Sequence, residues 1–147
     1  MAKFKVPGLK GASGDMGGGA YKPGKYILDI EEVRIEPNGE KNFTRVVVRG
    51  KFIDGPAQDN GRDINGAPFT TGITILEEGH RSYEQWAHIG VNELKALTTA
   101  TGTATNADAF DPDELVGKTV EVTLRQKKGD DGEVRNEVRK WAKDPEA

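Results

Sequence analysis

The chain has 147 residues, of which 35% are hydrophobic and 31% charged, and its formal net charge is −3. This length suits a single domain, and no stretch approaches the roughly 18 apolar residues that a membrane-spanning helix requires. The absence of cysteine excludes disulfides, thiolate metal sites and a cysteine nucleophile, and two histidines are too few for a histidine-rich metal centre. The first residues also lack the apolar run of a secretory signal, so we expect a soluble cytoplasmic protein.

The N-terminal segment, residues 1–24, is rich in glycine and lysine and shows no hydrophobic period. Its densest glycine stretch, residues 11–19, would lose much conformational entropy on ordering, and we expect a flexible basic arm. The globular domain is expected over residues 25–142, followed by a short tail at 143–147.

The first predicted strand spans residues 25–36. Hydrophobic residues alternate from Tyr26 to Ile30, lose phase at residues 31–32 and alternate again from Val33. A slip of one residue in a period of two is typical of a β-bulge, which bends a strand. The first strand is therefore expected to be bent.

The remaining pattern predicts four more strands and one helix. The strands are expected at residues 43–53, 69–76, 118–128 and 134–141, and the helix at 90–102, capped by Asn92 and ended by Gly102. Residues 110–117 predict a short acidic turn in which Asp111 caps a helical piece that begins at Pro112. This order, β-β-β-α-β-β, predicts a mainly β fold with one helix, a five-stranded Greek-key barrel of the OB type.

Motifs for catalysis and cofactors are weak. Residues 19–25 match the first seven positions of a phosphate-binding P-loop, but Tyr26 replaces the serine or threonine, and a strand follows where a helix is needed. The acidic residues of 108–114 lack the spacing of an EF-hand loop, which favours a solvated turn over a calcium site. We expect no enzyme, no cofactor and no metal site, and a metal-dependent enzyme is the weakest alternative.

The second predicted strand carries a row of basic side chains. Arg45, Arg49 and Lys51 alternate along one face at about 6.8 Å spacing, with Arg62 in the loop that follows. OB barrels bind ligands across strands two and three, where cations meet phosphates and aromatic rings stack on bases. Phe43 and Phe69 stand at strand ends as candidate rings. The alternative is that the cations only solvate a strand face and the rings belong to the core or its rim.

A second basic cluster lies in the last predicted hairpin, with Arg125, Lys127 and Lys128 on its first arm and Arg135, Arg139 and Trp141 on its second. Arg135, Arg139 and Trp141 share one face by the period of two, an arrangement that suits stacking and cation–π contact with a base. The alternative is an arginine that covers an exposed indole. The complete candidate nucleic-acid interface is Arg45, Arg49, Lys51, Arg62, Phe43, Phe69, Lys25, Arg135, Arg139 and Trp141.

Several short segments resemble one protein family. They are Pro23-Gly24-Lys25-Tyr26, Phe52 to Pro56, Gly90 to Gly102, Leu115 to Lys118, and Asn136 with Val138. Across residues 20–142 the chain resembles the small phage-encoded single-stranded-DNA-binding proteins of the OB type. The resemblance implies sequence-tolerant binding of single-stranded DNA during phage replication or recombination, in the cytoplasm of a host bacterium. It also implies phage replication or recombination proteins as partners.

A structural or interaction module is the alternative from another class. A virion component or an adaptor with a β-barrel core would use the basic arm for assembly into a homo-oligomer, and its cations would only provide solubility. The mass of the protein with and without residues 1–20 separates this alternative from a DNA-binding protein.

Overall fold

The computed structural model describes residues 3–7, 9–10, 20–59, 61–103, 105 and 108–146. Of the expected arm at residues 1–24, the densest glycine stretch, residues 11–19, lies outside the described residues. The strands are β1 (Gly24–Asn38), β2 (Phe43–Asp54), β3 (Pro68–Leu76), β4 (Thr119–Lys128) and β5 (Val134–Lys143). The helix α1 (Tyr83–Thr101) and the 3₁₀ turn η2 (Pro112–Glu114) lie between β3 and β4, so the predicted order of elements is confirmed.

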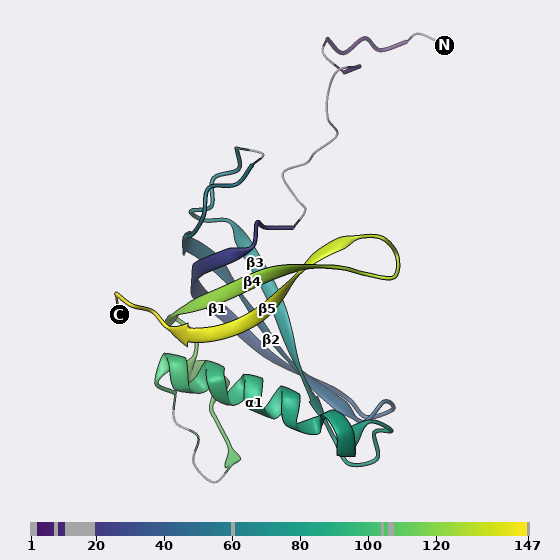
Figure 1. Ribbon diagram of the computed structural model, residues 1–147, viewed down its shortest axis with the longest axis vertical. Helices are drawn as coiled ribbons and strands as arrows, with labels where there is room; N and C mark the ends of the chain where they lie inside the picture. Colours follow the sequence, from purple (N-terminus) through teal and green to yellow (C-terminus); the bar gives the residue numbers. More distant parts are fainter. Residues whose placement is uncertain are drawn as a thin grey trace.

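The five strands form one antiparallel sheet in the order β3-β2-β1-β4-β5 (Figure 1). The strand β1 pairs with two neighbouring strands: residues 24–29 pair with β4, and residues 27–38 pair with β2. The register of β1 and β2 shifts between Ile30 and Glu32, which confirms the predicted bulge. Within the described residues no ladder joins β3 to β5, so the sheet is open, and the expected closed barrel is not observed.

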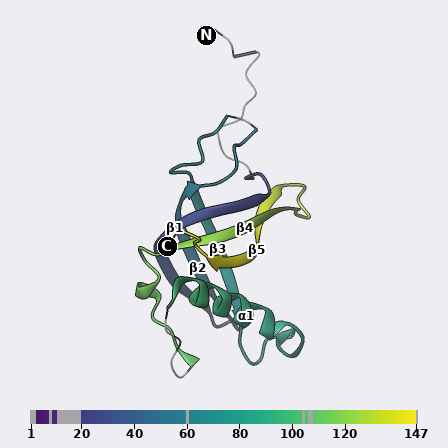
Figure 2. The same cartoon turned by 60° about the vertical axis from the view of Figure 1, so that its left-hand side comes forward.

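The core lies between the concave face of the sheet and α1. Its fully buried side chains come from every strand except β5 and include Tyr26, Leu28, Phe52, Ile73 and Val122. Leu97 and Thr98 of α1 are also fully buried and are the helix's contribution to the core. Figures 1 and 2 show α1 lying across the end of the sheet that is remote from the N-terminus. Among the described residues, no helix has the length and apolar character needed to span a membrane.

The helix begins seven residues before the predicted start at residue 90, at Tyr83. Asn92 is therefore an interior residue and not the N-cap, and Gly90 is buried in mid-helix. The C-terminal prediction is confirmed, since Gly102 adopts φ 72° and donates its N–H to the carbonyl groups of Thr98 and Thr99.

The acidic turn is confirmed as well. The side chain of Asp111 accepts a hydrogen bond of 3.0 Å from the N–H of Asp113 at the start of η2. Within the described residues, no group of three histidine, aspartate or glutamate side chains is placed to hold a metal ion.

Candidate nucleic-acid interface

The predicted row of cations on β2 exists, but it faces carboxylates on the neighbouring strand. Arg45, Arg49 and Lys51 lie on the outer face of β2 and pair in register with Glu36, Glu32 and Asp29 of β1. Arg49 Nη2 lies 3.2 Å from Glu32, and Lys51 Nζ lies 3.9 Å from Glu31. The outer face of β1 and β2 is therefore close to neutral, and two of the three predicted phosphate ligands already have anionic partners.

The outer face of β4 and β5 is positive. Together with the start of β1 it carries five basic side chains against two carboxylates: Lys25, Arg125, Lys127, Arg135 and Lys140 against Glu121 and Glu137. Arg125 forms two hydrogen bonds with Glu137, at 3.1 and 3.0 Å, and these lower the pKa of the Glu137 carboxyl. Arg135 pairs with Asp131 of the hairpin turn and lowers the pKa of that carboxyl.

Three cations of this face remain available for an anion. Among the described residues, Lys25, Lys127 and Lys140 take part in no ion pair, and all three are exposed. Arg139 is also exposed, at the position where the register of β4 and β5 shifts. The sequence placed Lys127 in the basic cluster of the last hairpin and Lys25, Arg135 and Arg139 in the candidate interface, but it did not single out Lys140. Lys140 was missed because the register shift between β4 and β5 moves it onto the outer face, which the period of two does not predict.

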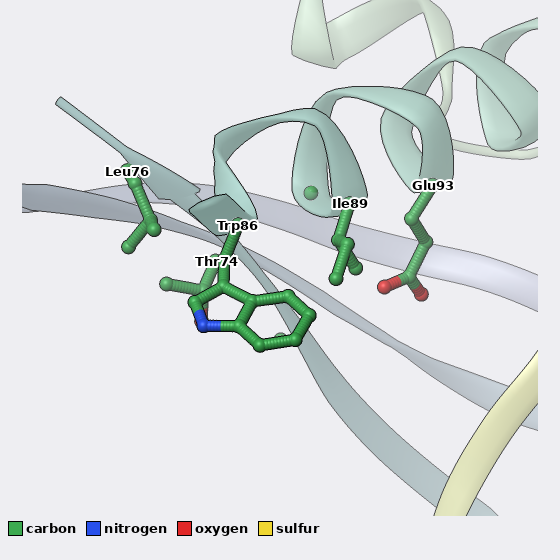
Figure 3. Close-up of a pocket in the computed structure, with 7 residues that line it drawn as sticks. Thr74, Leu76, Trp86, Ile89 and Glu93 are labelled. Carbon is green, nitrogen blue, oxygen red and sulfur yellow. The ribbon is translucent and has the colours of Figure 1, made fainter. Parts of the chain in front are cut away.

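A polar cleft separates the two unpaired strand edges, β3 and β5. One part, of about 380 Å³, is lined by residues 70–72 of β3, residues 136–138 of β5, Arg45 and Glu93. Arg45 reaches this cleft because Gly72 has no side chain, and a Cβ atom at residue 72 would lie 2.3 Å from the guanidinium Nη2. The cleft therefore offers hydroxyl and amide groups, which can hydrogen-bond the edges of bases, beside one cation, Arg45, and two carboxylates, Glu93 and Glu137. Figure 3 shows the side chain of Glu93 projecting from α1.

Tyr21 spans one end of this cleft. Its side chain is only 5% exposed, and its hydroxyl donates to the carbonyl oxygen of Pro68 on β3. Its N–H donates to Asn136 Oδ1 of β5 at 2.7 Å, and its carbonyl accepts from Asn136 Nδ2 at 2.9 Å. Arg62, a predicted phosphate ligand, lies 4.3 Å from the ring centroid of Tyr21 and donates to its hydroxyl at 2.8 Å. Arg62 therefore holds this bridge in place.

The predicted stacking rings are mostly buried. Phe69 is 7% exposed and stacks on Phe52 at 5.1 Å between centroids. Trp141 is 5% exposed, and its Nε1 donates to Glu93 at 2.9 Å. Only Phe43, at the start of β2, is half-buried. In this conformation Phe69 and Trp141 present no open ring face to a base, and Trp86 of α1, 48% exposed, is the accessible indole.

The opposite side of the cleft carries a perturbed acid. Burial raises the pKa of Glu93, the hydrogen bond from Trp141 opposes the rise, and the nearby charge of Glu137 adds to it. Glu93 and Glu137 both line the cleft, so its α1 end repels phosphates while its hairpin end attracts them.

A comparison with models of protein families found no match, and a search of curated proteins also found none.

Proposed function

We propose that this protein binds single-stranded DNA without sequence preference and without catalysis, during phage replication or recombination. The observation that carries the proposal is the positive outer face of β4 and β5, which adjoins a polar cleft between β3 and β5. Cations that follow the DNA backbone beside groups that meet the bases are the two elements of a single-strand site.

The topology supports the same proposal. A bent β1 shared by two halves of a sheet, with a helix between β3 and β4, agrees with an OB barrel that is partly open between β3 and β5. OB folds bind oligonucleotides across strands two and three and along the loops β1–β2 and β4–β5. The cleft beside β3 and the β4–β5 hairpin occupy corresponding positions.

The interface proposed from the structure gives the main role to other residues than the interface predicted from the sequence. The exposed side chains of Lys25, Lys127 and Lys140 are the proposed phosphate contacts, with Arg45 contributing from the cleft. Thr70 and Asn136 can hydrogen-bond base edges. Because Phe69 and Trp141 are buried, electrostatic contacts are expected to provide most of the binding free energy.

The test is fluorescence anisotropy with end-labelled oligo-dT and with a duplex of the same length, at a series of salt concentrations. We expect tighter binding of the single strand and an affinity that falls steeply with salt, by about 0.7 log units per tenfold salt for each phosphate contact. Equal affinity for the duplex would refute single-strand selectivity. Absence of binding at low salt would refute the proposal and favour the structural module.

A further inference from the structure

Asparagine stands directly before glycine in two turns of the described chain. Asn38-Gly39 lies between β1 and β2, and Asn65-Gly66 lies before β3. The pair at residues 60–61 includes residue 60, which is outside the described part of the chain. In such a pair the main-chain nitrogen of the glycine approaches the side-chain amide of the asparagine easily, because glycine has no Cβ atom to hinder it. The sequence therefore makes the two pairs equivalent candidates for intramolecular attack.

The structure leaves the nitrogen of Gly39 open to react. Gly39 is exposed, and its N–H donates no hydrogen bond to any residue that the structure describes. Asn38 Oδ1 accepts a hydrogen bond of 3.1 Å from the N–H of Lys41. A donor on this oxygen draws electrons from Cγ and stabilises the negative charge that develops on Oδ1 when a nucleophile attacks. The β1–β2 turn thus holds an activated amide beside an unprotected nitrogen.

The second pair is protected. The N–H of Gly66 donates a hydrogen bond of 2.7 Å to the carbonyl oxygen of Phe52, whose side chain is fully buried. The N–H of Asn65 also donates to Asp63 Oδ1 at 3.0 Å, which fixes the start of this turn. Attack by the Gly66 nitrogen would break its hydrogen bond and leave the Phe52 carbonyl without that partner, at a cost in free energy. The fold therefore separates two sites that the sequence alone does not distinguish.

We propose that Asn38 is a site of spontaneous deamidation in the folded protein and that Asn65 is spared. The nitrogen of Gly39 attacks Cγ of Asn38, the bond from Cγ to Nδ2 breaks, and the proton of the Gly39 N–H leaves with that amine as ammonia. Water then opens the cyclic imide at either of its carbonyl groups and leaves aspartate or isoaspartate. The net change is the loss of ammonia and the gain of water. The proposal is independent of DNA binding.

The product has a carboxylate where the protein had a neutral amide. Asn38 and Phe43 form the last pair of the β1–β2 ladder, so the extra main-chain carbon of isoaspartate lies at the end of the sheet and away from the core. The new charge joins Glu36 and Glu40 in the same hairpin. We therefore expect the protein to accumulate a more acidic form that keeps its fold.

Peptide mapping of the full chain, incubated folded at mildly alkaline pH, tests the proposal. Trypsin releases Asn38 and Asn65 in separate peptides, residues 35–41 and 63–81. The mass gain of an amide-to-acid change should appear at Asn38 at least about tenfold faster than at Asn65, since reaction at Asn65 requires the loss of a hydrogen bond. In guanidinium chloride the two rates should become similar, because unfolding removes the protection of Gly66.

The variant Gly39→Ala tests the role of the open turn. A Cβ atom at residue 39 meets nothing within 4 Å, and Gly39 is not among the glycines with positive φ, so the variant should fold. Its methyl group hinders the approach to Asn38 and should slow the mass gain there by about tenfold or more, with the rate at Asn65 unchanged. Equal rates at Asn38 and Asn65 in the folded protein would overturn the proposal. The same ratio of rates in guanidinium chloride, or an unchanged rate in Gly39→Ala, would overturn it as well.

Discussion

The carbonyl oxygen of Thr74 in β3 lies directly against Gly90 of α1. A Cβ atom at residue 90 would stand 1.9 Å from that oxygen, a distance that no side chain can occupy. Gly90 is buried in the middle of the helix, where glycine is otherwise unfavourable relative to alanine. The close approach of the helix to β3 therefore depends on the missing side chain at this position.

Gly90→Ala should destabilise the protein. The methyl group would collide with the backbone of Thr74, which cannot rotate aside, so the helix must move away from β3, and we expect a loss of about 1–3 kcal/mol in the free energy of unfolding despite the better helix propensity of alanine. Urea denaturation followed by circular dichroism measures the change. Gly39→Ala is the control, because nothing lies within 4 Å of a Cβ atom at residue 39. Equal stability of both variants would contradict the tight contact.

Tyr21→Phe should weaken the bridge across the β3–β5 cleft. The hydroxyl is buried, donates to Pro68 and accepts from Arg62, so its removal should cost about 1 kcal/mol of unfolding free energy. Chemical denaturation gives the value. Tyr83→Phe is the matched control, since the Tyr83 hydroxyl forms no hydrogen bond among the described residues. A loss for Tyr83→Phe as large as that for Tyr21→Phe would argue against a specific bridge.

Local patterns predicted the strands well. The expected and observed boundaries of β2, β3 and β4 agree within one residue, and the loss of phase at residues 31–32 located the bulge in β1. Alternation works here because successive side chains of a strand point to opposite faces of the sheet, and one of those faces is buried.

Features that depend on distant partners were not predictable. Gly90 was interpreted as a helix boundary because its reason, the carbonyl of Thr74, lies 16 positions earlier on another element. The carboxylates that pair with Arg49 and Lys51 become neighbours only through the register of β1 and β2. Tyr21, assigned to the arm, is buried by contacts with Pro68 and Asn136.

The double variant Lys25→Gln with Lys127→Gln tests whether the positive face is the proposed contact surface for single-stranded DNA. Both lysines are exposed on the positive face and form no ion pair among the described residues, so the double variant should lower the slope of log affinity against log salt by about 1.4 for two lost contacts. Anisotropy titrations with oligo-dT measure the slope. Arg49→Gln with Lys51→Gln removes the same charge from β2 and should change the slope less, since both cations have carboxylate partners. The opposite ranking would move the interface to β2.

Glu93→Gln should make stability less dependent on pH. Burial raises the folded-state pKa of Glu93 above the usual 4.5, so the folded protein holds this proton more tightly than the unfolded chain. The resulting stabilisation is complete below the unfolded pKa and is lost as pH rises through the folded pKa. Glutamine keeps the acceptor for Trp141 Nε1 without the charge, so the variant should gain stability relative to wild type as pH rises from the unfolded pKa through the raised folded pKa, and the gain should then level off, as urea denaturation at each pH would show. Glu84→Gln, on the exposed first turn of α1, is the control, and an equal gain there would contradict the role of burial at Glu93.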